Sequence, residues 1–334
     1  MASRLLAFVV AVAMVLGAVA VRARINDGDS KSGSAGRSGP LELVCATELR
    51  QVCDAIDAGA SGLSVTVEPA AVTADRLEST ELKDAAIDGW LAPGPWGELV
   101  DAARPSDTGK LFADSGAPLA RSPFVLAVWK DKRAKLACPD PVDLGCVGDA
   151  VNTREFKLGV AADDQAEGVL ADAALGAGHI KNPNFATNDL TETDLSDWLA
   201  GVDTNADRVA RNPGGRSFAE MLTFGFAVAE GYLSTEAVIG PQLARAAKRS
   251  QLDLVYVVPA ATADVLFAPR TGDRGTRLRD VVRGERALEA LRANGWRVPG
   301  RPAVAGINPN ALKLAADDGL PSAGVLQALR DVTK

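Results

Sequence analysis

Histidine is almost absent from this chain. Among its 334 residues there is one, His179, and histidine is both the commonest metal ligand and a frequent catalytic base. Most histidine-based metal and catalytic sites are therefore excluded. An excess of positive charge is also missing, because 36 Lys and Arg stand against 43 Asp and Glu, a formal charge of −7. A general nucleic-acid-binding protein needs a basic surface, so we expect no nucleic-acid partner.

Signs of an enzyme are equally sparse. The sequence has no G-x-S-x-G elbow and no S-x-x-K pair, two patterns that would indicate a serine nucleophile. A Ser-His-Asp site would have to use His179, which lies in the run GAGHIKNPN. We interpret that run as a solvated loop, where a histidine has no fixed position for proton transfer. The sequence therefore predicts a protein that is not an enzyme and that needs no cofactor and no metal.

One long apolar run stands at the N-terminus. Residues 5–21 read LLAFVVAVAMVLGAVAV and carry no charge. Seventeen residues is long for the core of a signal peptide and at the lower limit for a membrane span. Residues 18–20 (AVA) fit the small-x-small pattern of signal cleavage. Residues 1–24 are thus a cleaved signal peptide, an uncleaved membrane anchor or, as a third reading, a buried core helix. We expect an exported protein of the cell envelope, anchored or secreted.

The segment after this run is predicted to be a tether. Residues 25–40 are rich in Gly and Ser and contain almost no large apolar side chain, a composition typical of flexible linkers. The folded part is predicted to begin near Leu41.

The four cysteines form two local pairs. Cys45 and Cys53 are eight residues apart, and so are Cys138 and Cys146. Zinc sites favour shorter C-x₂₋₄-C spacing, whereas an exported chain meets oxidising conditions. We therefore predict the disulfides Cys138–Cys146, across a Pro- and Gly-containing loop, and Cys45–Cys53, between a strand end and a helix. Buried free thiols are the alternative.

Apolar periodicity predicts alternating strands and helices. The expected strands cover 41–46, 63–67, 85–91, 111–112, 124–129, 156–161 and 252–258. The expected helices cover 48–58, 74–82, 96–103, 165–176, 217–230, 242–250, 278–293 and 324–332. Residues 179–212 are polar and are left without an assigned element. This alternation is typical of an α/β fold with mainly parallel sheets.

Several segments, taken in order, resemble a type II periplasmic solute-binding protein. The matching segments are LELVCATELRQVCDAI, DGWLAPGPWGELV, LARSPFVLAVW, LSTEAVIG, LDLVYVVPAATADVLFAP, ALEALRANGWRVPG and GLPSAGVLQALRDV. The nearest variant is the solute-binding module that precedes von Willebrand factor A domains in some actinobacteria. The resemblance covers about Leu41 to Lys334, and no von Willebrand domain follows in this sequence.

The resemblance implies two lobes, each a mainly parallel sheet flanked by helices, with ligand bound in the cleft between them. Lobe one would comprise 41–125 plus 255–334, and lobe two would comprise 126–254. Two hinge crossings would join them, near 127–130 and near 254–257. Closure of lobes about such a hinge is known for periplasmic binding proteins.

Ligand-facing residues follow from the rule that ligands of open α/β sheets lie outside the carboxyl ends of strands, often at helix N-termini. The candidates are Thr47, Trp90, Ser122, Asp164, Gln165, Thr235 and Glu236. Each has a structural alternative. Thr47 and Thr235 with Glu236 could serve as helix caps, Trp90 could belong to the core, and Ser122 could be an extended residue before a proline.

The acidic residues at these helix starts argue against an anionic ligand. Asp163, Asp164 and Glu167 begin one predicted helix, and Glu48 follows Thr47. Carboxylates there would repel sulfate, phosphate or molybdate and would occupy the helix N–H groups themselves. We therefore expect a neutral or cationic solute, a peptide-like ligand, or no small ligand.

Two functions remain open after these arguments. The first is an extracytoplasmic solute-binding protein of an ABC-type importer, with a small-molecule solute and a membrane permease as partners. The second is a ligand-free interaction or sensory module of the same fold, with another envelope protein as partner.

Overall fold

The computed structural model describes residues 39–81, 84–106, 109–192, 194–208, 217–313 and 321–332. The chain divides into two units, Met1–Gly39 and Pro40–Lys334. The second contains every described helix and strand, and we call it the folded unit. The apolar run 5–21 and most of the predicted tether lie outside the described residues. Within the described ranges, no helix has both the length and the apolar character needed to span a bilayer.

A continuous sheet runs through the folded unit in the order β2-β1-β3-β9-β4-β7-β5-β6, with β8 paired to β4. The first sheet half consists of β1 (Leu41–Ala46), β2 (Leu63–Glu68), β3 (Gly89–Pro93) and β9 (Thr262–Pro269). The second sheet half consists of β5 (Leu158–Val160), β6 (Asp207–Arg208), β7 (Gly231–Thr235) and β8 (Leu252–Tyr256). β1 is parallel to β2 and β3, and β5 is parallel to β6 and β7.

Strand β4 (Ala120–Trp129) joins the two sheet halves. Residues 120–123 pair antiparallel with β9, whereas residues from Phe124 onward pair antiparallel with β7, and from Val125 onward also with β8. The chain passes back between β8 and β9, over residues 257–261. Ten consecutive residues from Ala120 are buried apart from Arg121, which suits a central strand covered on both faces.

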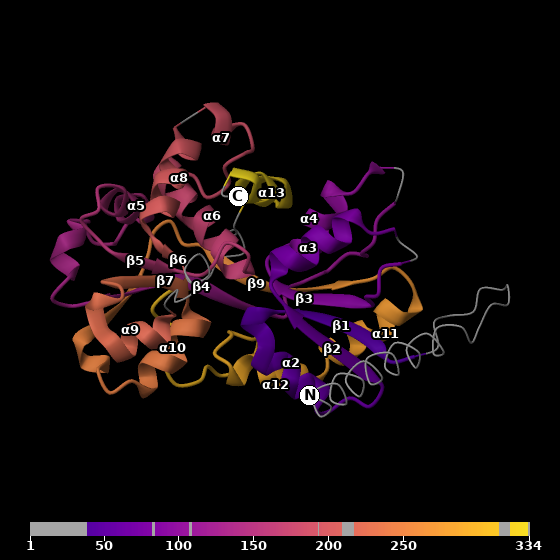
Figure 1. Cartoon of the computed structure of the whole chain (residues 1–334). Helices are drawn as coiled ribbons and strands as arrows, with labels where there is room; N and C mark the ends of the chain where they lie inside the picture. Colours follow the sequence, from indigo (N-terminus) through magenta and orange to yellow (C-terminus); the bar gives the residue numbers. More distant parts are fainter. Residues whose placement is uncertain are drawn as a thin grey trace, which may run out of the picture. The chain divides into compact units, whose positions relative to one another are not determined.

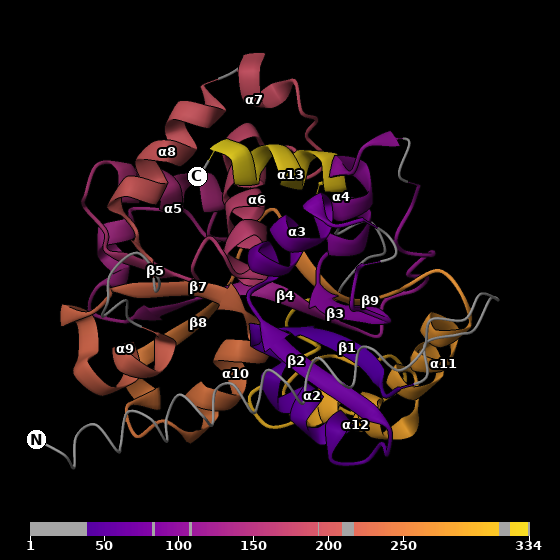
Figure 2. The ribbon, with the colours of Figure 1, turned by 45° about the vertical axis from the view of Figure 1, so that its right-hand side comes forward.

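Helices cover both faces of each sheet half (Figures 1 and 2). On one face of the first half lie α3 (Ala70–Ser79) and α4 (Trp96–Ala103), and on the other lie α2 (Arg50–Asp57) and α12 (Glu285–Ala293) with α11 (Asp273–Val282) at the side. In the second half, α5 (Leu144–Asn152), α6 (Ala166–Ile180), α7 (Asp189–Glu192) and α8 (Leu195–Asn205) lie on one side and α9 (Phe218–Phe224) and α10 (Glu236–Arg245) on the other. The last helix, α13 (Ala323–Val332), contacts both α4 and α6.

The core follows this arrangement. One large cluster of buried apolar side chains extends through both sheet halves, and a smaller one, with Trp129, Phe218 and Tyr232, lies between β7, β8 and the α9–α10 layer. Burial of this apolar surface is the main stabilising contribution to the fold.

The α/β architecture and most predicted elements are confirmed, although several boundaries are wrong. The strand predicted at 85–91 is β3, which begins only at Gly89, and Leu111–Phe112 contributes an isolated bridge from Phe112 to Arg270. The helix predicted over 278–293 is two helices, because Gly284 separates α11 from α12. The helix predicted at 242–250 is α10, which starts six residues earlier and ends at Arg245. Strands β7 and β9 were not predicted as separate elements.

The interpretation of His179 as a solvated loop residue is wrong. The residue belongs to the last turn of α6, and its ring stacks on Trp198 of α8 with centroids 4.3 Å apart. His179 Nε2 also lies 3.0 Å from Asp194 Oδ1. The glycines that suggested a loop serve close packing instead: a Cβ at Gly178 would lie 2.5 Å from the backbone nitrogen of Gly145 in α5. Helices α7 and α8 likewise occupy a stretch that the sequence left unassigned.

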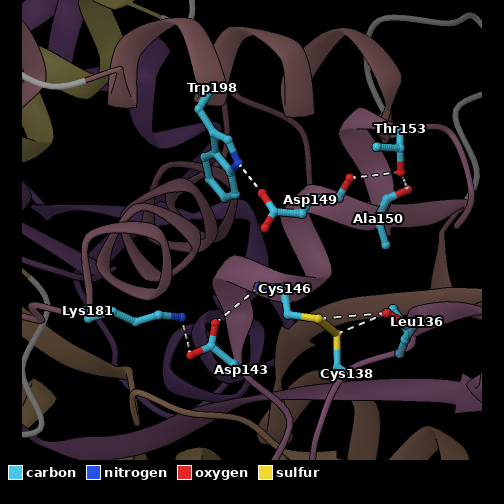
Figure 3. The surroundings of a disulfide bond; sticks show 9 residues. All are labelled: Leu136, Cys138, Asp143, Cys146, Asp149, Ala150, Thr153, Lys181 and Trp198. Carbon is cyan, nitrogen blue, oxygen red and sulfur yellow. Dashed lines mark hydrogen bonds and ion pairs between the residues drawn. A yellow bond between two sulfur atoms is a disulfide. The ribbon is translucent and has the colours of Figure 1, made fainter.

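Both predicted disulfides are present, and Cys45 pairs with Cys53 and Cys138 with Cys146. Cys45 and Cys53 are fully buried, whereas Cys138 and Cys146 are half-buried. Figure 3 shows the second bridge beside Asp143, whose side chain caps α5 by accepting from Cys146 N at 3.1 Å and pairs with Lys181 at 2.5 Å. The bridge thus ties the loop before α5 to the first turn of that helix.

The two disulfides should differ in their contribution to stability. Each closes a loop of the same sequence separation, 8 residues, so loop closure predicts the same contribution, about 2–3 kcal/mol. Cys45→Ala/Cys53→Ala also leaves a cavity in the core, and we expect it to lower the free energy of unfolding more than Cys138→Ala/Cys146→Ala does. Urea denaturation of both variants measures this, and an equal or reversed order would contradict the burial described here.

Candidate functional site between the two sheet halves

Three strand ends point toward one place in the fold. After β1 the chain enters the 3-10 helix η1 (Thr47–Leu49) and then α2, after β5 it enters α6, and after β7 it enters α10. Such strand ends are where α/β folds usually bind ligands, because the following helices present free N–H groups. The first of these ends belongs to the first sheet half and the other two belong to the second.

A carboxylate from the protein itself occupies the start of α6. Glu48 Oε1 accepts a hydrogen bond from the backbone N–H of Glu167 at 2.9 Å, across 119 residues of sequence. Glu167 is the second residue of α6, so Glu48 fills the position that a capping side chain or a bound anion would take. This hydrogen bond joins the two sheet halves directly.

Glu167 in turn occupies the start of α10. Glu167 Oε1 accepts from the Ser234 hydroxyl at 2.6 Å and from the Thr235 N–H at 2.7 Å. The N–H of Ala237, the second residue of α10, donates to Ser122 Oγ at 2.9 Å. We call Glu48, Glu167, Ser234 and Thr235 the carboxylate junction. In it, side chains of the protein accept from the N–H groups of Glu167 and Thr235, at two helix starts where an anion could otherwise bind.

The junction is held in place by close packing of the α6 turn. A Cβ at Gly168 would lie 1.9 Å from the carbonyl oxygen of Ala162, so only glycine allows the loop before α6 to fold against its first turn. That loop carries Asp164, whose carbonyl accepts from the N–H of Ala71 in α3 at 3.0 Å. This is a second hydrogen bond between the two sheet halves.

The electrostatics of the junction favour protonated carboxyl groups. Burial raises the pKa of Glu48 to about 7, the N–H of Glu167 opposes this shift, and the negative charges of Glu167 and Asp164 add to it. Burial also raises the pKa of Glu167 against its hydrogen bonds from Ser234 and Thr235. Burial and the charge of Asp163 raise the pKa of Asp164. Three neighbouring carboxyl groups therefore lie in an environment that disfavours negative charge.

Two cavities of about 510 Å³ each flank the junction. The first is lined by residues of α10 that include Arg245, and by Thr47, Glu48, Arg50, Gln51, Asn294 and Trp296. The second lies between α3, α8 and α13 and is lined by Asp163, Asp164 and other acidic residues, with Arg330. Their volumes fall within the usual range for small-molecule sites.

Three of the seven predicted ligand-facing residues, Thr47, Asp164 and Thr235, belong to the junction or line one of its cavities. Gln165 lies next to Asp164 in the chain, just before α6. Thr47 is not a cap, because Ala46 is the N-cap of η1. Thr235 is the N-cap residue of α10, with Glu236 in the first turn, but its side chain makes no capping bond. Gln165 is the N-cap residue of α6, again without a side-chain capping bond. Within the described ranges, Thr47 Oγ1, Glu48 Oε2 and Asp164 Oδ1 are buried oxygens without a hydrogen-bond partner.

The other three candidates are committed to contacts inside the protein. Trp90 is 1% exposed, and its ring packs against Trp96 and Phe112. Ser122 holds the N–H of Ala237. Glu236 is fully buried and pairs with Arg297 at 2.6 Å, and it also accepts from the Tyr256 hydroxyl and the Asn308 N–H.

Sequence reasoning missed the two residues that organise the site. Glu48 and Glu167 were recognised as carboxylates at helix starts that oppose anion binding, but neither was predicted as a site residue, and Ser234 was not considered. The available signal was the adjacency of Glu48 to Thr47. It could not reveal that Glu48 reaches the start of a helix in the other sheet half.

Solved structures of binding proteins have a similar fold over nearly their whole length. A periplasmic thiamin binding protein aligns with a TM-score of 0.56 at 15% identity, over 91% of this chain and 98% of its own. The periplasmic binding protein AfuA from Actinobacillus pleuropneumoniae, with fructose-6-phosphate bound, gives 0.55 at 12% identity over 88% and 95%. The sulfate-binding protein SubI from Mycobacterium tuberculosis H37Rv gives 0.51 at 15% over 86% and 96%. The chain has the fold of type II periplasmic binding proteins.

At these identities the likeness concerns the fold. No protein-family model matches the sequence, and no match to a curated protein was found. The fold alone does not indicate a class of ligand, so we argue the ligand class from the residues of the carboxylate junction.

The pKa shift at the junction predicts how stability depends on pH. A carboxyl whose pKa is about 7 when folded and about 4.3 when unfolded binds its proton more tightly in the folded state, so its contribution falls as pH rises from about 4.3 through 7. Glu48→Gln mimics the protonated form. We expect this variant to exceed the natural protein in unfolding free energy by about 2–3 kcal/mol at pH 8 and by less than about 1 kcal/mol at pH 4.5.

Chemical denaturation at both pH values tests the expectation, with Glu155→Gln as the control because Glu155 is an exposed carboxylate outside the junction. A Glu48→Gln variant that is less stable than the natural protein at pH 8 would contradict the description of the junction.

Proposed function

We propose that this chain is an extracytoplasmic solute-binding protein, the substrate-binding component of an ABC-type importer, and that its solute is neutral or cationic. The observation that carries the proposal is the convergence of three helix starts from two sheet halves on one junction, within a fold shared with binding proteins over nearly their whole length. A membrane permease is the partner that this role requires.

The ligand class rests on the carboxylate junction. An anion would have to displace Glu48 from the N–H of Glu167 and would meet the charges of Glu167 and Asp164 nearby. A cation or a hydrogen-bond donor would instead find the oxygens Glu48 Oε2 and Thr47 Oγ1 buried without partners. Supplying a partner to a buried polar atom removes a cost of about 1–3 kcal/mol, so this chemistry favours a donor-rich or positively charged solute.

The mechanism that we propose is closure of two lobes about the solute. Lobe one comprises 41–125 plus 255–334 and lobe two 126–254. The change of β4 from β9 to β7 and β8 near Phe124, together with the return of the chain over residues 257–261, supports two crossings between them. The hydrogen bonds of Glu48 to Glu167 and of Asp164 to Ala71 would break on opening and form again on closure.

The location that we propose is outside the cytoplasm. The apolar run at residues 5–21 and the two disulfides support export, with the run either cleaved or kept as an anchor. The order of the matching segments supports a relation to the module that precedes von Willebrand factor A domains.

A second candidate is a ligand-free interaction or sensory module of the cell envelope, with an envelope protein as partner. One observation favours it: the carboxylate junction already bridges the two sheet halves using only side chains of the protein. In such a module this closed arrangement would be permanent.

A ligand screen distinguishes the two candidates. The melting temperature of the folded unit is measured against oxyanions, sugars, amino acids, polyamines and metal ions. A ligand at 100 times its Kd adds about 2.7 kcal/mol of stability, which raises the melting temperature of a chain of this size by several degrees. We expect a neutral or cationic compound to raise it. Tight binding of sulfate, phosphate or molybdate would contradict the proposed ligand class. A melting temperature that no compound changes would favour the second candidate.

The affinity for a cationic solute should depend on the protonation of Glu48. Because the pKa of Glu48 is about 7, the cation competes with a proton, and we expect affinity to fall about ten-fold per pH unit below pH 7 and to change little above it. Glu48→Gln should bind more weakly and without this pH dependence, whereas Glu155→Gln should behave as the natural protein. Calorimetric titration between about pH 5.5 and 8.5 measures both, and an unchanged pH profile in Glu48→Gln would refute this role.

A further inference from the structure

Two exposed aromatic side chains lie at the end of α9, in the second sheet half. Phe224 is 66% exposed and Phe226 is 51% exposed, although phenylalanine is usually buried. They stand on either side of Gly225, whose φ of +81° breaks α9 and turns the chain into the 3-10 helix η4 (Gly225–Ala227). The backbone at this glycine thus presents two aromatic rings to the solvent rather than folding them onto the core.

The two rings border a cavity of about 590 Å³ with a mainly apolar character. Trp129, at the end of β4, forms part of its wall together with Phe224, Phe226 and Ala227. We call Trp129, Phe224, Phe226 and Ala227 the aromatic patch. A large exposed aromatic group on a soluble unit commonly marks an interaction site.

Lysines surround the aromatic patch. Lys132 Nζ lies 4.1 Å from the centre of the Phe226 ring, and Lys248 Nζ lies 5.9 Å from the centre of the Trp129 ring. Lys157 Nζ donates to the carbonyl of Ala227 at 2.9 Å, and Lys248 Nζ donates to that of Thr223 at 3.0 Å. Carbonyl oxygens and ring faces are uncharged, so these contacts do not neutralise the ammonium groups. The whole chain, in contrast, has a formal charge of −7.

Acidic side chains also lie near the aromatic patch. Asp131 Oδ2 lies 3.8 Å from Lys132 Nζ, and Asp253 Oδ1 lies 3.8 Å from Lys130 Nζ. Both distances are at the outer limit of an ion pair. Glu230 is buried and pairs with Lys135. The aromatic patch therefore combines exposed rings with a rim of basic residues.

We propose that the aromatic patch docks on an anionic lipid surface. Aromatic rings enter the boundary between headgroups and acyl chains, while lysines extend to the lipid phosphates. Self-association through this patch would place the same lysines opposite one another, which is unfavourable.

The test uses the folded unit Pro40–Lys334, which contains both disulfides and the described core, because the 5–21 run would itself enter lipid. Sedimentation with vesicles of equal phosphatidylglycerol and phosphatidylcholine is compared with vesicles of phosphatidylcholine alone. We expect binding that requires phosphatidylglycerol and weakens at about 500 mM salt. Phe224→Ser/Phe226→Ser should weaken it at least about ten-fold, and Lys132→Gln about five-fold.

Matched controls alter equally exposed groups elsewhere. Val72→Ser removes a side chain on α3 that is 48% exposed, and Arg277→Gln removes an exposed basic group on α11. Neither should change vesicle binding, and all four variants should keep the melting temperature of the natural unit because the altered side chains are at least partly exposed. Absence of phosphatidylglycerol-dependent binding, or equal losses in the controls, would overturn the proposal. So would a dimer that Phe224→Ser/Phe226→Ser dissociates while vesicle binding is unchanged.

Discussion

The candidate site depends on one hydrogen bond, in which the N–H of Glu167 in the first turn of α6 donates to the carboxylate of Glu48. It joins the two sheet halves, occupies the place where the fold could receive an anion, and brings Glu48 close to Glu167 and Asp164. The arrangement gains from the helix dipole and loses from burial and repulsion between carboxylates. Burial is the larger effect, which is why the pKa of Glu48 rises to about 7 rather than falling.

The consequence is a binding fold whose would-be anion sites are filled by its own side chains. Glu48 accepts from the N–H of Glu167 at the start of α6, Glu167 accepts from that of Thr235 at the start of α10, and Ser122 accepts from that of Ala237. The cavity beside Glu48 presents this carboxylate and Thr47 together with the side chains of Arg50 and Arg245. The carboxylates at these helix starts oppose the binding of an oxyanion, and they are the physical basis of our proposal that the solute is neutral or cationic.

Local patterns in the sequence were sufficient for much of the fold. The alternation of apolar strands with amphipathic helices predicted the α/β class, and the cysteine spacing predicted both bridges. The errors arose where local signals compete with packing: His179 and its glycines resembled a loop but pack α6 against α5 and α8. The site was harder, because Glu48 meets Glu167 across 119 residues. Only the placement of two helix starts brings them together, and no short-range pattern records it.

The most direct test of this account is the pKa of Glu48 itself, measured by carbon-13 NMR titration of the side-chain carboxyl groups and assigned with Glu48→Gln. The account predicts a midpoint near 7 that moves downward when a cationic ligand binds. A midpoint near about 4.3, the value of an exposed glutamate, would contradict it, because Glu48 would then be a solvated carboxylate rather than the buried link between the two sheet halves.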